Sequence, residues 1–139
     1  MTALSRKMKI IFVNGCFDIL HRGHLELLSY AKSLGDKLVV AIDSDEKIKN
    51  DKGNARPINC VEDRKYFLSC VQFVDEVRIF NSAEELENLI KDISPDIMVV
   101  GTDWRGKTIV GGQFAKKIKY FKRINEYSTT QIIEHISNR

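Results

Sequence analysis

Residues 9–24 read KIIFVNGCFDILHRGH, and this stretch decides the fold. An apolar run ends at Val13, an Asn-Gly pair follows, and apolar residues at helical spacing begin after His24. The order predicts a buried strand, a turn and a helix. In an open parallel sheet, such a turn lies at the carboxyl end of the strand, where ligands dock and where a helix N-terminus can receive a phosphate.

The alternation of strand and helix continues outward from this stretch. Short apolar runs recur at 9–13, 38–42, 77–80, 97–100 and 118–121, with helical patterns between them. Such β-α-β alternation is typical of a parallel sheet covered on both faces. A chain of 139 residues has room for one core. We therefore predict a single α/β domain over residues 1–139, Rossmann-like and doubly wound, with a five-stranded, mainly parallel sheet.

Capping patterns mark the expected helices. The first helix is predicted from His24 to Leu34, with Gly35 placed to end it. Three later pairs place a cap residue three positions before an acid or amide: Asn59 with Glu62, Ser82 with Glu85, and Ser128 with Gln131. They predict helices near 60–71, 83–93 and 129–137. The polar stretch 43–57 is predicted to be a loop.

Composition limits the class of partner. The net charge is +3, from 22 basic and 19 acidic residues, which does not suggest the concentrated basic face of a nucleic-acid-binding protein. Three cysteines without C-x-x-C spacing disfavour a disulfide framework and a cysteine-rich zinc site, and reduced thiols favour a cytoplasmic location. No apolar run approaches the roughly 20 residues needed to cross a bilayer. We expect small anionic substrates, with neither nucleic acid nor membrane as a partner.

His21 and His24 are the first candidate catalytic residues. Imidazoles three positions apart at a helix start lie on neighbouring parts of one face, and both can donate hydrogen bonds to phosphate oxygens. By itself, a histidine pair is more often a surface or core feature, or a pair of metal ligands. The residues around this pair favour the catalytic interpretation.

The segment from Asn14 to His24 resembles the GxFDxxHxGH signature of the cytidylyltransferase-like, or HxGH, nucleotidyltransferases. Fingerprints of the dinucleotide-binding and Walker A types are absent. The KMSKS lysine loop of class I aminoacyl-tRNA synthetases, which share the HxGH device, is absent too. The resemblance implies an enzyme that moves a nucleotidyl group from an NTP, with Mg²⁺, to a phosphorylated polyol or sugar. It also implies a homodimer.

Later segments resemble motifs of the same family. Residues 101–107, GTDWRGK, resemble the GDDWxGK segment of glycerol-3-phosphate cytidylyltransferases, with Thr102 in place of the first acid. Residues 123–130, RINEYSTT, resemble RTEGISTT, with Glu126 in place of its glycine. Each of these residues also has a purely structural alternative. Any one loop lysine can be a solvated surface residue, Trp104 can be a core residue, and Ser128 can be a simple helix cap.

The resemblance also implies the site residues, with no metal ligated directly by a side chain. The predicted catalytic residues are His21, His24, Arg64 and Lys52. The predicted nucleotide-binding residues are Asn14, Gly15, Cys16, Phe17, Asp18, Gly23, Gly101, Asp103, Trp104, Arg123, Ser128, Thr129 and Thr130.

Two halves of the chain resemble different relatives. The segment 14–24 and Arg56-Pro-Ile-Asn59 look like heptose-1-phosphate adenylyltransferases, whereas residues 103–107 and Arg123 look like glycerol-3-phosphate cytidylyltransferases. Because Arg123 is expected near the base, we favour transfer of CMP from CTP to a polyol phosphate such as glycerol 3-phosphate. The alternative is ATP with heptose 1-phosphate or a related sugar phosphate. A second alternative is a non-catalytic nucleotide-binding module.

Overall fold

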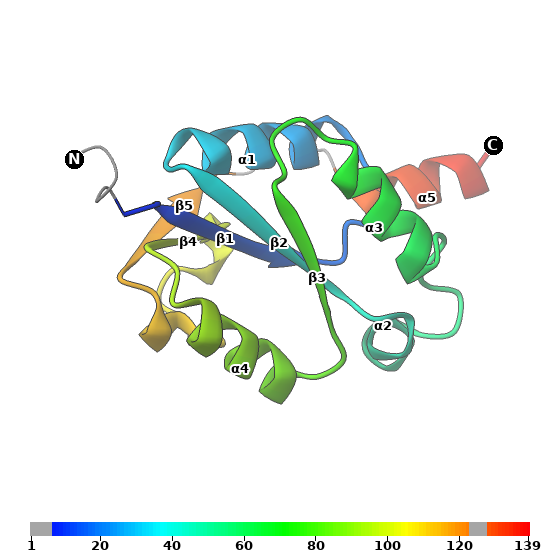
Figure 1. The fold of residues 1–139 in the computed structure, drawn as a ribbon. Coiled ribbons are helices and arrows are strands. Elements are labelled where there is room, and N and C mark those ends of the chain that lie inside the picture. Colours follow the sequence, from blue (N-terminus) through cyan, green and yellow to red (C-terminus); the bar gives the residue numbers. More distant parts are fainter. Residues whose placement is uncertain (1–6, 123–127) are drawn as a thin grey trace.

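The computed structural model describes residues 7–122 and 128–139 as a central sheet with helices on both faces (Figure 1). Its strands are β1 (Ile10–Gly15), β2 (Lys37–Asp43), β3 (Glu76–Phe80), β4 (Ile97–Gly101) and β5 (Lys117–Phe121). They lie in the order β3-β2-β1-β4-β5, and every neighbouring pair is parallel. The predicted Rossmann-like sheet is therefore confirmed.

The helices are α1 (Arg22–Ser33), α2 (Asp45–Lys52), α3 (Val61–Ser69), α4 (Ala83–Ile93) and α5 (Thr129–Ser137). Successive residues of a strand face opposite sides of a sheet. Accordingly, Ile11 packs in one core with Leu28 of α1 and Leu68 of α3, while Phe12 packs in the other with Ile90 of α4. The alternation gives two buried layers, one on each face.

The order of the strands positions the site. From β1 the chain moves outward through β2 to β3, and then crosses to the other side of β1 to form β4 and β5. The connections that follow β1 and β4 therefore diverge at the carboxyl edge of the sheet. Such a switch point leaves a crevice in which α/β proteins bind ligands.

The helix α2 corrects the prediction of a loop over 43–57. Ser44 caps α2 by accepting a hydrogen bond from the Lys47 N–H at 3.1 Å, and Lys47 forms ion pairs with Asp43 and Asp51 one turn away on either side. Only Ile48 is buried, so the helix carries almost no apolar periodicity. In the sequence, α2 can be recognised only from its N-cap and its i,i+4 ion pairs. A search for apolar residues at helical spacing does not detect either feature.

Two of the three predicted helix caps are confirmed, and the third is not. Ser82 and Ser128 cap α4 and α5 as predicted. Asn59 does not cap α3, because Cys60 is the N-cap and the Asn59 amide instead donates to the backbone oxygen of Asp18. The helix α1 begins at Arg22, two residues before the predicted start.

Candidate active site

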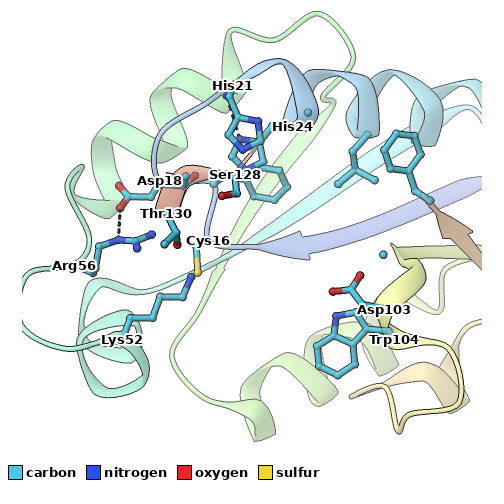
Figure 2. Close-up of a pocket in the computed structure, with 16 residues that line it drawn as sticks. Cys16, Asp18, His21, His24, Lys52, Arg56, Asp103, Trp104, Ser128 and Thr130 are labelled. Atoms are coloured by element: carbon cyan, nitrogen blue, oxygen red, sulfur yellow. Dashed lines mark hydrogen bonds and ion pairs between the residues drawn. The ribbon is translucent and has the colours of Figure 1, made fainter. Parts of the chain in front are cut away.

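A cavity of about 470 Å³ opens where β1 and β4 end (Figure 2). Segments far apart in the sequence meet around it: the β1–α1 connection, the end of α2, the residues after β4 and the start of α5. It is lined by Cys16, Phe17, Asp18, His21, Gly23, His24, Leu27, Lys52, Arg56, Gly101, Asp103, Trp104, Phe121, Ser128, Thr129 and Thr130. We call it the first cavity.

The two histidines form one wall of the first cavity. His21 is the N-cap of α1, with extended backbone, and His24 lies in the first turn. Their rings stack with centroids 3.8 Å apart, and Nδ1 of His24 accepts a hydrogen bond from the His21 N–H at 3.3 Å. A neutral imidazole that accepts at Nδ1 carries its proton on Nε2. His24 is thus held as a donor beside a helix N-terminus.

Phe17 supports this wall. Its ring centroid lies 5.0 Å from that of His24, and its side chain is almost fully buried. Its backbone has a φ of +50°, in the left-handed region. Residues other than glycine adopt this conformation at a cost in conformational free energy. The adjoining Gly15 accommodates the ring closely, since an added Cβ there would lie 3.1 Å from a Phe17 ring carbon.

The start of α5 faces the same cavity with hydroxyl groups. Ser128 accepts a hydrogen bond from the Gln131 N–H at 3.0 Å, while Thr129 donates to the Ile19 carbonyl oxygen at 3.2 Å. The second bond ties α5 to the β1–α1 connection across 110 residues of sequence. Two helix N-termini, those of α1 and α5, therefore border one space, and each offers backbone N–H groups to an anion.

Lys52 and Arg56 supply positive charge to the first cavity. Lys52 is the last residue of α2, and Arg56 lies in the connection that follows it. Arg56 and two apolar lining residues, Leu27 and Phe121, are absent from the residues predicted from the sequence. Arg56 begins the Arg56-Pro-Ile-Asn59 segment, whose resemblance indicated a class of relatives but assigned no role to the arginine.

Asp18 lines the cavity, but its carboxylate is engaged elsewhere. The side chain is buried, and its oxygens accept from the Ile58 and Asn59 N–H groups and from Arg56 Nε. A carboxylate in this position would repel phosphate. Asp18 thus holds the connection after α2, and its contact with the nucleotide stays a prediction.

Arg64 lies beneath the first cavity, at the carboxyl end of the sheet. It is fully buried and is not among the residues that line the first cavity. Its guanidinium donates to the carbonyl oxygens of Asn59, Cys16 and Asp43 and pairs with the Asp45 carboxylate at 2.7 Å. With these acceptors satisfied, Arg64 holds the segments beneath the site together. Its direct contact with the triphosphate stays a prediction.

Asn14 and Gly15 border a second cavity, of about 360 Å³, on the other side of the end of β1. This second cavity shares Gly101 and Trp104 with the first, so the Trp104 side chain stands between the two. Most of its walls are apolar, and Asp43 and Lys47 add an ion pair. Arg123, also predicted to bind nucleotide, lies outside the described residues.

The Asp103 carboxylate lies close to Gly101. A Cβ added to Gly101 would lie 2.7 Å from an Asp103 carboxylate oxygen, so a side chain at 101 would displace the acid from its present position. Trp104 is about half exposed, which disfavours the alternative that it simply closes the core.

The Cys16 thiol faces the first cavity beside Lys52 (Figure 2). Burial raises the pKa of the Cys16 thiol, as does the negative charge of Asp43, while Lys52 opposes the rise. A raised pKa keeps the thiol protonated at neutral pH, and a protonated thiol is a poor nucleophile. Cys16 is therefore suited to a contact and not to covalent chemistry.

A parallel α/β domain with an HxGH pair, two helix N-termini and two cations around one cavity has the site of a nucleotidyltransferase. Residues 12–135 match the model of the family described as cytidylyltransferase-like. The chain belongs to this family.

The curated proteins to which the chain is similar include several named bifunctional protein HldE. It is 47% identical over 132 residues to the one from Campylobacter concisus (strain 13826), covering 95% of this chain and 28% of that protein. The one from Helicobacter pylori (strain HPAG1) is 45% identical over 130 residues, which cover 94% of this chain and 28% of that protein. The chain thus spans little more than a quarter of these relatives.

Solved structures show the same fold. The lipopolysaccharide core biosynthesis protein from Thermoplasma volcanium GSS1 superimposes with a TM-score of 0.66 at 26% identity, covering 88% of this chain and 100% of that one. Pantothenate synthetase from Thermus thermophilus has a TM-score of 0.63 at 14% identity, with 89% of this chain and 61% of that one covered. The second likeness concerns the fold alone. In the described part of the chain, no helix combines the length and apolarity that crossing a membrane requires.

Proposed function

We propose that this chain transfers AMP from ATP to heptose 1-phosphate or a closely related sugar phosphate and releases pyrophosphate. The observation that carries the proposal is the meeting of His21, His24 and the Ser128–Thr130 turn at one cavity with two cations. Each of these groups suits a triphosphate: donors on developing charge, N–H groups on phosphate oxygens, and cations on the remaining charge.

The comparisons favour ATP and a sugar over the CTP and polyol that the sequence suggested first. The similarity to the HldE proteins extends over almost the whole chain, and the Thermoplasma protein is named for the lipopolysaccharide core. Both support the sugar phosphate alternative, which the segments 14–24 and 56–59 had already indicated. The preference for CTP depended mainly on Arg123, which lies outside the described residues.

The chemistry would be a direct displacement. The acceptor phosphate is largely dianionic at neutral pH because its second pKa is about 6, so it needs no general base. One of its oxygens attacks the α-phosphorus, a new P–O bond forms, and the bond to the β-phosphate oxygen breaks with its electrons leaving on pyrophosphate. The protein aligns the two phosphates, and Nε2 of His24 donates to the oxygens on which charge builds.

The second cavity suits the sugar of the acceptor. It adjoins the first at Gly101 and Trp104, so a sugar seated there could direct its phosphate toward the histidines. The indole of Trp104 offers an apolar face to a sugar ring. Asn14 and Asp43 are polar groups on this side that can bind hydroxyls.

Magnesium is expected from the resemblance, and the residues present fit an ion held mainly by its substrate. Within the described ranges, no three His, Cys, Asp or Glu side chains cluster as a metal site. Asp18 is engaged by backbone N–H groups, which leaves Asp103 as the carboxylate of the first cavity that could approach the ion. When bound, Mg²⁺ would supply charge neutralisation on the triphosphate.

The test is a pyrophosphate release assay of the purified protein with Mg²⁺, either ATP or CTP, and a panel of sugar and polyol phosphates. We expect release with ATP and heptose 1-phosphate that exceeds release with CTP and glycerol 3-phosphate. The opposite preference would return the assignment to a cytidylyltransferase. Tight nucleotide binding without any release would favour a non-catalytic module.

A further inference from the structure

The connection between α2 and α3 is fastened to the β1–α1 connection by a buried carboxylate. Asp18 is 1% exposed, and its oxygens accept from the N–H groups of Ile58 and Asn59, each at 2.8 Å. The Asn59 amide returns a bond to the Asp18 carbonyl oxygen, also at 2.8 Å. Residues 40 positions apart are thereby held together, and the backbone that carries Arg56 is fixed relative to the histidine wall.

Arg56 is oriented by the same carboxylate. Its Nε lies 3.2 Å from Asp18 Oδ2, and its side chain is 13% exposed. Within residues 7–122 and 128–139, the structure gives its two Nη groups no hydrogen-bond partner. Figure 2 shows the guanidinium extending from Asp18 into the first cavity, on the side where Lys52, Cys16 and Thr130 lie. Because Arg56 is held through Nε, its two Nη groups can donate hydrogen bonds to a ligand in the first cavity.

The position of Arg56 limits which phosphate group its side chain can contact. It lines the first cavity with the histidines and the Ser128–Thr130 turn, and it does not line the second cavity. Two other cations of this region are engaged by protein acids: Lys47 by Asp43 and Asp51, and Arg64 by Asp45. Arg56 also has an acid partner, but its fork of donors extends beyond it and can bind two phosphate oxygens at once.

We propose that Arg56 binds the β- and γ-phosphates of the nucleotide, and that Asp18 is the positioning residue that directs it there. The inference rests on the proposed function, which assigns the α-phosphorus to the histidines. The guanidinium then neutralises charge on pyrophosphate as the bond to the α-phosphorus breaks. Lys52, on the same side of the cavity, adds a second positive charge.

The test compares binding of ATP, AMP and inorganic pyrophosphate to the wild-type protein and to Arg56→Gln by calorimetry. Loss of charged hydrogen bonds should weaken binding of ATP and pyrophosphate by about ten- to a hundredfold. AMP lacks the β- and γ-phosphates, so its affinity should not change. Lys49→Gln removes a charge from an exposed position on α2 that lines neither cavity, and it should leave all three affinities unchanged.

Two further variants test the part played by Asp18. Arg56→Lys keeps the charge without the fork and should recover part of the lost affinity for pyrophosphate. Asp18→Asn, if its thermal melting shows a folded protein, should weaken the binding of ATP and pyrophosphate, as Arg56→Gln does. Its affinity for AMP should not change. In steady-state kinetics, the KM for ATP should rise in Arg56→Gln while the KM for the sugar phosphate stays constant.

Equal binding of ATP by the wild-type protein and Arg56→Gln would overturn the inference, as would an equal loss of AMP and ATP affinity. A wild-type protein that binds neither ATP nor pyrophosphate would overturn it together with the proposed function. Turnover of sugar phosphate that Arg56→Gln leaves intact would overturn the inference alone. Binding of pyrophosphate through Arg56 without transfer to any sugar phosphate would overturn the proposed function alone.

Discussion

The guanidinium of Arg64 joins four segments of the chain beneath the first cavity. Its acceptors belong to the residue after β1, the last residue of β2, the first residue of α2 and the residue just before the N-cap of α3. A buried charge is tolerated only when it is paired and hydrogen-bonded. Arg64 meets that condition with protein atoms, so its contribution is to the shape of the cavity floor.

Arg64→Lys should therefore act on stability. Lysine keeps the charge but cannot reach all four acceptors, which leaves buried carbonyl groups unsatisfied. We expect the free energy of unfolding to fall by about 2–4 kcal/mol, measured by urea denaturation. A variant with wild-type stability and a large loss of turnover would contradict this role and restore the predicted contact with phosphate.

His24→Ala addresses the chemistry itself. The substitution removes a donor beside the α1 N-terminus and should reduce kcat at least about a hundredfold, with the fold retained by circular dichroism. His135→Ala, at an exposed position near the end of α5, is the matched control and should have wild-type turnover. Near-normal turnover of His24→Ala would show that the imidazole does not contact the reacting phosphate.

Single residues also show what sequence could and could not predict of the site. His21, His24 and Ser128–Thr130 were predictable because each stands in a compact motif beside a strand end or a helix start. Arg56 was not, since its importance comes from a pairing with Asp18 that lies 38 positions away in the sequence. The burial of Arg64 could not be predicted either, because charged residues are rarely fully buried.

The strands are aligned at their amino ends by a repeated device. Asp36, Asp75 and Asp96 each stand just before a strand, and each accepts a hydrogen bond from a backbone N–H within one residue of the start of a neighbouring strand. The donors are Lys9, Leu38 and Ile10, respectively. These bonds satisfy N–H groups at the edge of the sheet and favour one register of the parallel pairs.

Asp96 makes the device sensitive to acid. The hydrogen bond from the Ile10 N–H, and then that from Lys116, lower the pKa of Asp96 in the folded chain. Its contribution to stability is therefore present above the ordinary pKa of about 3.9, and it is lost as the pH falls through the lowered value. Asp96→Asn should be less stable than the wild-type protein by about 1 kcal/mol at neutral pH.

That difference should shrink in the acid range, because Asp96 becomes protonated first in the unfolded wild-type chain, and folding must then release that proton. Denaturant unfolding of both proteins at neutral pH and at about pH 3, below the ordinary pKa, would measure it. A difference that stays constant across this range would show that the charge of Asp96 contributes nothing to folding.

Elements were predictable where apolar spacing was strong. The helices α1 and α4 and all five strands carry buried or half-buried residues at regular intervals, whereas α2 has one buried side chain and was predicted as a loop. Gly35 directly follows the C-cap of α1, Leu34, so the helix ends where this glycine was predicted to end it. The missing side chain also leaves room for Ile11 and the Lys9 carbonyl oxygen, which an added Cβ would approach to within 2.9 Å.

At the scale of the whole molecule, the described residues form a parallel sheet whose order reverses at β1 (Figure 1). The residues that line the first cavity include several that follow the ends of β1 and β4. The family assignment, residues 12–135, spans every strand except the first two residues of β1. The topology follows from β-α-β alternation, since such connections almost always cross over in one hand. In the proposed function, the choice of nucleotide and acceptor depends on the shape of two adjoining cavities.

The central claim is that one triphosphate occupies the first cavity between the histidines and the start of α5. A crystal structure of the protein soaked with a non-hydrolysable ATP analogue tests it most directly. We predict the α-phosphate beside His21 and His24, with phosphate oxygens at the N–H groups of the Ser128–Thr130 turn. A triphosphate bound elsewhere on the molecule, away from both histidines, would contradict the account.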